Sequence, residues 1–262
     1  MIINTQTIKK SGGGRGTYQV EAGFLSGYNE LIRPSLHTPA GTVFVPSDNP
    51  ADYTKVDWIG CQENGTGGVS QGPYIKTGIV LDSTDKVEAE VSVNNTQNNM
   101  SIWSARSFSN NLPVNQFGVF SLTTGLRFDY GTTTYSSSVL SANAKHKCLS
   151  DKNKAYLDDV LVNEFTSSIF STVNQVFLFA SYWTDDSVGN FLSGRSYGWK
   201  CWNSLGNPKA SFFPVYHTDT GILGMFDAVN NKFHMNAGAG DFTKPSDTSG
   251  EINLATYLAS LT

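Results

Sequence analysis

Apolar and polar residues alternate one by one along several short stretches of the chain, the pattern of β-strands with one buried and one solvated face. The clearest case is "DKVEAEVSV" at residues 85–93. Its apolar face holds Val87, Ala89, Val91 and Val93, and its polar face holds Glu88, Glu90 and Ser92. This stretch therefore predicts a half-buried strand of a one-sided sheet.

Turn residues separate further strand patterns and predict antiparallel hairpins. "KAYLDDVLVNEF" predicts a hairpin that turns at Asp158 and Asp159, and "FDAVNNKFHM" predicts another that turns at Asn230 and Asn231, because Asn tolerates left-handed backbone. "NQVFLFASYW" is apolar on both faces, which is typical of a central strand. The even spacing of such strands favours an antiparallel sandwich.

The two ends of the chain differ from this middle part. Residues 1–50 contain the glycine-rich "SGGGRG" and four prolines in "IRPSLHTPAGTVFVPSDNPADY", which prevent continuous strand pairing and predict an extended arm. Near the other end, Leu254, Tyr257, Leu258 and Leu261 recur at helical spacing. The expected organisation is an N-terminal arm at 1–50, a sandwich at 51–244 and a tail with a short docking helix at 245–262.

Composition excludes several classes of function. A net charge of -4 over 262 residues gives no basic field for nucleic acid. No apolar run approaches the roughly 20 residues that span a bilayer, so we expect no membrane insertion. The first residues lack the apolar stretch of a signal peptide, so we expect the protein to be made and kept in the cytoplasm. The widely spaced Cys61, Cys148 and Cys201 predict reduced thiols rather than disulfides or a zinc site.

Glycine-rich stretches do not predict a nucleotide site. "GGGRG" lacks the Lys-Ser/Thr of a phosphate-binding loop, and no helix follows Gly238 and Gly240. The four histidines are scattered and do not predict a catalytic triad or a metal site. Asp158-Asp159 and Asp185-Asp186 are interpreted as turn residues rather than Ca²⁺ ligands. We therefore expect no cofactor and no metal.

One set of motifs resembles a known family. The run "GILGMFDAVNNKFHMNAGAGDFT" is similar to the closing segment of concanavalin A-like, laminin G-type sandwiches, which occur in bacteriophage virion proteins and in surface proteins of gut bacteria. The stretches "YTKVDWIG", "GPYIKTGI", "FGVF", "LRFDYG", "KAYLDDVLV" and "FFPVY" precede it in the expected order. The resemblance covers about residues 51–244 and implies an all-β, antiparallel jelly-roll β-sandwich.

Some proteins of this fold are glycoside hydrolases with a Glu-x-Asp-x-x-Glu motif on one strand. Glu88 and Glu90 lie two residues apart, which places them roughly 6.5–7 Å apart, near the separation that carboxylate catalysis uses. The intervening Asp and the third acid are missing here. We therefore interpret both residues as part of a solvated strand face, and we expect no enzymatic activity.

Glycan binding would use aromatic faces that stack on sugar rings, flanked by side chains that bond hydroxyl groups. The candidates are Trp103, Arg106, Arg127, Tyr182, Trp183, Arg195, Trp199 and Trp202. The alternative for each aromatic residue is a place in the sandwich core, where large rings also gather.

The resemblance implies a structural virion protein of a bacteriophage, such as a head fibre, capsid decoration or tail fibre. Other virion proteins would bind the arm, the sandwich would face outward towards host surface glycans, and the virion would be its location. Exposed strand edges favour a homo-oligomer, with a trimer expected for a fibre. The alternatives are a bacterial cell-surface or secreted carbohydrate-binding protein and, third, a glycoside hydrolase.

Overall fold

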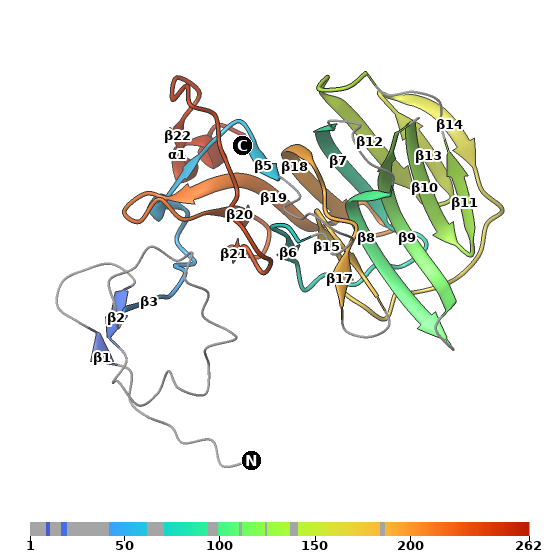
Figure 1. The fold of residues 1–262 in the computed structure, drawn as a ribbon, viewed down its shortest axis with the longest axis horizontal. Coiled ribbons are helices and arrows are strands. Elements are labelled where there is room, and N and C mark those ends of the chain that lie inside the picture. The colour runs from blue at the N-terminus through green and yellow to red at the C-terminus, as the bar shows by residue number, and fades with distance from the viewer. Residues whose placement is uncertain are drawn as a thin grey trace, which may run out of the picture.

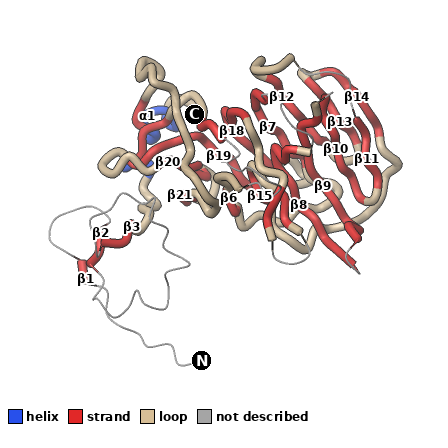
Figure 2. Tube along the Cα trace, viewed as in Figure 1, coloured by secondary structure: helices blue, strands red, loops and turns tan. Residues whose placement is uncertain are grey.

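The computed structural model describes residues 9–10, 17–19, 42–61, 71–93, 99–109, 112–123, 125–136, 141–183 and 187–261. Strands make up most of this part, and the short α1 (Leu254–Ala259) lies near the C-terminal end (Figure 2). Three short strands of the predicted arm, β1 (Lys9–Lys10), β2 (Thr17–Gln19) and β3 (Thr42–Phe44), form an antiparallel sheet. The rest of residues 1–41, including "GGGRG", lies outside the described residues.

Two larger antiparallel sheets form the main body (Figure 1). In the large sheet the strand order is β14 (Val160–Glu164), β13 (Lys154–Leu157), β12 (His146–Asp151), β7 (Lys86–Val93), β18 (Gly194–Trp202), β19 (Pro208–His217), β20 (Leu223–Asp227) and β21 (Lys232–Met235). At its side, β5 (Ile59–Cys61) pairs with β18, β4 (Tyr53–Lys55) pairs with β19, and β22 (Ile252–Asn253) pairs with β4. The 3₁₀ turn η2 (Pro50–Asp52) precedes β4.

The small sheet lies against the large one. Its strand order is β11 (Thr133–Ser136), β10 (Gly125–Gly131), β9 (Leu112–Leu122), β8 (Met100–Ser109), β15 (Phe177–Leu178) and β6 (Ile75–Lys76). The ribbon β16 (Ser181–Tyr182) and β17 (Val188–Gly189) follows β15. The chain is thus an all-β sandwich with a short C-terminal helix, as the sequence predicts. Its jelly-roll topology stays a prediction.

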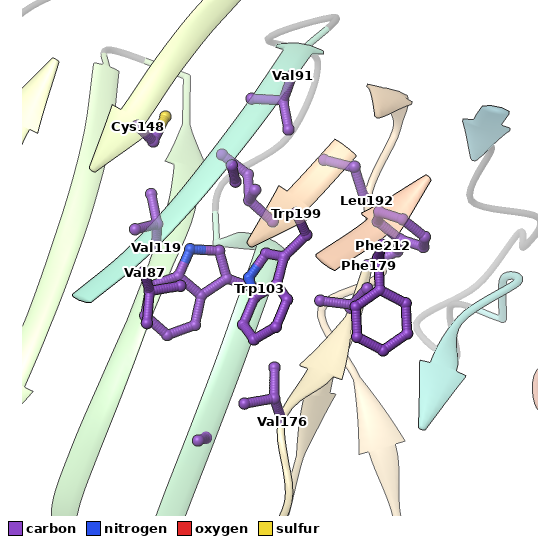
Figure 3. Close-up of a cluster of buried hydrophobic side chains, with 14 of the residues drawn as sticks. Val87, Val91, Trp103, Val119, Cys148, Val176, Phe179, Leu192, Trp199 and Phe212 are labelled. Atoms are coloured by element: carbon purple, nitrogen blue, oxygen red, sulfur yellow. The ribbon is translucent and has the colours of Figure 1, made fainter. Parts of the chain in front are cut away.

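The main core fills the space between the two sheets. Val87, Ala89, Val91 and Val93 of β7 are all buried in it, which confirms the predicted apolar face. Figure 3 shows residues of both sheets meeting in this core. On the polar face of β7, Ser92 departs from the prediction because it is also buried.

Both predicted hairpins form. Asp158 and Asp159 connect β13 to β14 with positive φ angles of 49° and 66°. Asn231, at φ 47°, ends the connection from β20 to β21, and the Asn230 side chain donates to Asp227 Oδ2 at 2.6 Å. Asp and Asn tolerate left-handed backbone better than most other residues that carry a side chain, which suits them to these positions.

The stretch "NQVFLFASYW" forms less strand than its apolar pattern predicts. Only Phe177 and Leu178 join the small sheet, where β15 is buried and has the expected interior position between β8 and β6, and Ser181 and Tyr182 pair separately with β17. Phe179 follows with a positive φ of 70°, which interrupts the extended backbone. A positive φ at a bulky residue is unfavourable, and here the ring is buried against Phe242 at 5.8 Å between centroids.

A second cluster of buried residues joins the two ends of the described chain to the large sheet. Its members are Phe44, Tyr53, Phe213, Val215, Phe226, Phe233 and Leu254. Phe44 belongs to the predicted arm and Leu254 to the predicted tail, so both segments pack on the sandwich beyond the boundaries 51–244. Leu254 is fully buried at the start of α1, whereas Leu261, assigned to the same docking face, is 59% exposed.

Candidate functional site

A groove of about 560 Å³ lies on the outer face of the large sheet, away from the main core. We call it the outer groove. It is lined by Lys55, Asp57, Trp58, Glu88, Glu90, Lys145, Tyr197, Gly198, Trp199, Lys200, Phe212, Phe213 and Tyr257. Strands β7, β18 and β19 supply most of its floor, and the segment after β4, the residue before β12 and helix α1 supply its walls.

The acidic pair that the sequence places on the solvated face of β7 points into this groove. Glu88 lies directly opposite Lys200 of β18, and Glu90 lies opposite Gly198. Glu90 forms an ion pair with Lys145, with 2.8 Å between Oε2 and Nζ. Among the described residues, the side chain of Glu88 makes neither a hydrogen bond nor an ion pair. Its carboxylate is therefore available to a ligand.

A bulge in β18 brings Tyr197 into the groove. The pairing register of β18 with β7 shifts between Ser196 and Gly198, so Tyr197 is the additional residue. An additional residue bends the strand locally and changes the direction of its side chain. The strict alternation of faces is lost at this point, because Tyr197 and the next residue, Gly198, both line the groove.

Three aromatic side chains of the walls each carry a cation of the same chain over one ring face. The pairs are Arg195 over Trp58 at 4.4 Å from the ring centroid, Lys145 over Tyr197 at 4.7 Å and Lys55 over Tyr257 at 4.7 Å. Such contacts contribute about 0.5–1 kcal/mol at exposed sites and hold the rings in place. Burial lowers the pKa of Lys55 below its ordinary value.

Two of the predicted sugar-stacking residues belong to the main core. Trp103 and Trp199 are 0% and 2% exposed, and their rings meet edge-on at 6.3 Å between centroids (Figure 3). Trp103 also packs edge-on against Phe117 at 5.5 Å. Because protein covers both faces of each indole, the structure places these rings in the alternative role of core residues. Trp199 borders the outer groove only from below its floor.

Arg106 and Arg127 meet on the outer face of the small sheet, where they surround Asp129. Nη2 of Arg106 is 3.4 Å from Oδ2 of Asp129, and Nε of Arg127 is 2.9 Å from Oδ1. The two guanidinium groups lie over the ring of Phe120 at 4.6 and 4.2 Å. Burial raises the pKa of Asp129 above its ordinary value, although both arginines oppose this shift. The arginines thus bind a carboxylate of their own chain.

The other candidates are spread over the surface. Trp183 is 40% exposed and lies 5.6 Å from the guanidinium of Arg106. Tyr182 packs on Phe177 at 5.7 Å. Trp202 is half-buried beneath Lys86 and does not line the outer groove, whereas Arg195 is exposed beside it. The structure therefore does not bring the predicted set together in one site.

Sequence reasoning missed the aromatic walls of the outer groove. Trp58 and Tyr197 stand in strand-like stretches, and the helical spacing predicts for Tyr257 only a place on the docking face of the helix. The available signal was the polar face of β7, since Glu88 and Glu90 mark which side of the large sheet lacks a covering layer. Trp58 and Tyr197 could then have been sought on neighbouring strands.

Thiol, metal and membrane features add little to this site. Cys61, Cys148 and Cys201 are free and buried, and burial raises the pKa of each thiol, that of Cys201 to about 12. In the described ranges, no cluster of three or more His, Cys, Asp or Glu side chains could hold a metal ion. Asp185 and Asp186, the other predicted turn pair, lie outside the described residues. No helix among the described residues has the length and apolar character to cross a membrane.

No family model matches the sequence, and no curated protein matches it. The similarity to concanavalin A-like sandwiches therefore stays a resemblance. A function has to be inferred from the geometry of the outer groove.

Proposed function

We propose that this protein binds glycans without cleaving them and that the outer groove is the binding site. The observation that carries the proposal is the free carboxylate of Glu88, directly opposite Lys200, in a groove of about 560 Å³ with aromatic walls. Ligand pockets for small molecules enclose roughly 300–1,000 Å³, so the groove has room for a short oligosaccharide.

The groove offers the two kinds of contact that sugars need. A hydroxyl group both donates and accepts hydrogen bonds, so neighbouring hydroxyls can be held between a carboxylate, which accepts, and an ammonium group, which donates. Glu88 and Lys200 are such a pair. The rings of Trp58 and Tyr197 present apolar area beside them, on which the C–H face of a sugar ring can pack.

Binding is favoured over hydrolysis by the state of the acidic pair. Glycoside hydrolysis needs two carboxyl groups, one as a general acid and the other as a nucleophile or base. Here Glu90 is engaged by Lys145 at 2.8 Å, and only Glu88 is free. Screening the purified protein on polysaccharides should therefore show no turnover. Turnover that Glu88→Gln abolishes would replace the binding function with a hydrolase.

The biological setting is a separate proposal. We propose, from the resemblance, a bacteriophage virion protein that attaches through its arm, with a bacterial cell-surface or secreted carbohydrate-binding protein as the alternative. The groove has room only for a short oligosaccharide, and we expect each single site to bind weakly. Several copies on one particle would supply useful avidity.

A glycan array followed by calorimetry on the best ligand tests the binding site. Trp58→Ala and Glu88→Gln should each weaken binding at least tenfold, since each removes a contact to sugar. Trp202→Ala is the matched control, because Trp202 lies on the same sheet face but outside the groove. Loss of binding in the control with no loss in the other two variants would contradict the proposed site.

A further inference from the structure

The C-terminal tail provides one wall of the outer groove. Tyr257 of α1 lines the groove, and its ring packs edge-on against Phe213 of β19 at 5.4 Å between centroids. Lys55 of β4 lies over the same ring at 4.7 Å. Tyr257 thus stands between the second cluster and the ligand space, next to two residues that also line the groove.

Strand pairing fixes the tail at its start. Ile252 pairs with Lys55 and Asn253 with Thr54, which extends the large sheet by one short strand. Nδ2 of Asn253 donates to the carbonyl oxygen of Ala51 at 2.9 Å, and Oδ1 of the same side chain accepts from the first turn of α1. These contacts define where the helix begins and which way it runs.

Glu251 fastens the tail to the edge of the groove from outside it. One carboxylate oxygen forms an ion pair with Lys244, and the other accepts a hydrogen bond from the hydroxyl of Tyr216 at 2.9 Å. None of these three residues lines the groove. Glu251 is therefore a positioning residue, which can affect a ligand only through the place of the tail.

The helix cannot hold Tyr257 in place by itself. α1 has 6 residues, and isolated helices shorter than about 12–15 residues are marginal in water. Its position depends on burial of Leu254 in the second cluster and on the contacts of Asn253 and Glu251. A tail that came loose would take Tyr257 away and leave the groove open at the side of Phe213.

We propose that Tyr257 contacts the bound glycan and that the docked tail sets which glycans the groove accepts. This inference rests on the proposed glycan-binding function and assigns part of the specificity to a segment outside the resemblance. The ring borders the groove beside Lys55 and Phe213, so a ligand that fills this part of the groove meets it. Without the ring, larger or branched glycans gain space while ligands of matching width lose a stacking partner.

Point variants of the full chain test this inference on the same array and by calorimetry. Tyr257→Ala should weaken the best ligand roughly tenfold, as expected for loss of one ring contact, and should change the order of preferred glycans. Tyr257→Phe, which keeps the ring, should retain binding. Leu261→Ala is the control, since this side chain is 59% exposed just beyond α1 and does not line the groove.

Glu251→Gln tests the positioning role separately. It changes no residue that lines the groove, and we expect weaker binding together with faster hydrogen exchange in residues 252–259 at an unchanged melting temperature. Wild-type affinity and glycan order in both Tyr257→Ala and Glu251→Gln, with binding lost in Trp58→Ala, would overturn this inference alone. Absence of any glycan binding by the wild type would instead overturn the proposed function and this inference together.

Discussion

Replacing Lys209 by Met would leave a buried carboxylate without its counter-ion at the end of two strands, β7 and β19, that carry the outer groove. Lys209 lies at the start of β19, and its Nζ is 2.6 Å from Oδ2 of Asp85, just before β7. The same ammonium donates to the carbonyl oxygen of Val80 at 2.8 Å. The Asp85 side chain is only 2% exposed, whereas that of Lys209 is 26% exposed.

The magnitude follows from this asymmetry. Removing one partner of a buried pair costs about 3–5 kcal/mol, because the remaining charge is neither paired nor solvated. Water reaches the ammonium side, so we expect the lower end, about 3 kcal/mol, for Lys209→Met. Asp85→Asn should cost less, about 1–2 kcal/mol, because the amide still accepts from Asp82 N and the free ammonium can turn to water.

Urea unfolding followed by tryptophan fluorescence measures these changes in the free energy of unfolding. In the double variant, adding Lys209→Met to Asp85→Asn should cost less than about 1 kcal/mol, because no buried charge remains. Lys154→Met is the control, since its ion pair with Glu164 is exposed and 3.9 Å long, and it should cost at most about 0.5 kcal/mol. A cost of Lys209→Met no greater than that of the control would refute the reasoning.

Two further predictions concern the cores. Trp103→Ala should lower the free energy of unfolding by about 3–5 kcal/mol and leave the glycan affinity of the folded protein unchanged, and the reverse outcome would make the ring a sugar contact. Burial lowers the pKa of His217, so the unfolded chain binds a proton more readily, and stability should fall as the pH drops below about 6.5 until the folded pKa is reached. His217→Gln should flatten this pH dependence of urea unfolding by up to about 1.4 kcal/mol per pH unit, and an unchanged slope would contradict it.

Local patterns predicted local structure well. The alternation at Val87 to Val93, the hairpins at Asp158-Asp159 and Asn230-Asn231 and the helix at Leu254 all form, because each depends on neighbouring residues and on the backbone that Asn and Asp tolerate. The same holds for the antiparallel all-β class. These features require no knowledge of which strands lie side by side.

The site could not be predicted in the same way, because alternation says which residues share a face but not which face becomes covered. Bulges also interrupt the alternation of buried and exposed side chains at two of the aromatic residues considered for the site. The register of β8 with β9 shifts between Ser101 and Trp103, and Trp103 lies in the core together with its neighbour Ile102. Tyr197 enters the groove through the comparable shift in β18.

The sequence also gives no sign that residues beyond 244, the predicted end of the sandwich, pair with its strands. Pairing of Asn253 with Thr54 joins residues that are far apart in the chain, and such pairing leaves no local signal in either stretch. The helix near Leu254 was predicted, but its place against Phe213 and Lys55 depends on that distant pairing. Tyr257 therefore had no visible link to Glu88 or Trp58 in the sequence.

This long-range pairing also has a consequence in time. During synthesis, β4 emerges long before its partners β19 and β22, and β5 emerges long before β18, so the first strands of the large sheet must wait unpaired. Contacts of large sequence separation form slowly, and unpaired strand edges expose a nascent chain to aggregation. Trp58 is made early and Tyr257 late, so the outer groove is among the last parts of the molecule to form, and incomplete chains lack the part of its lining that Tyr257 supplies.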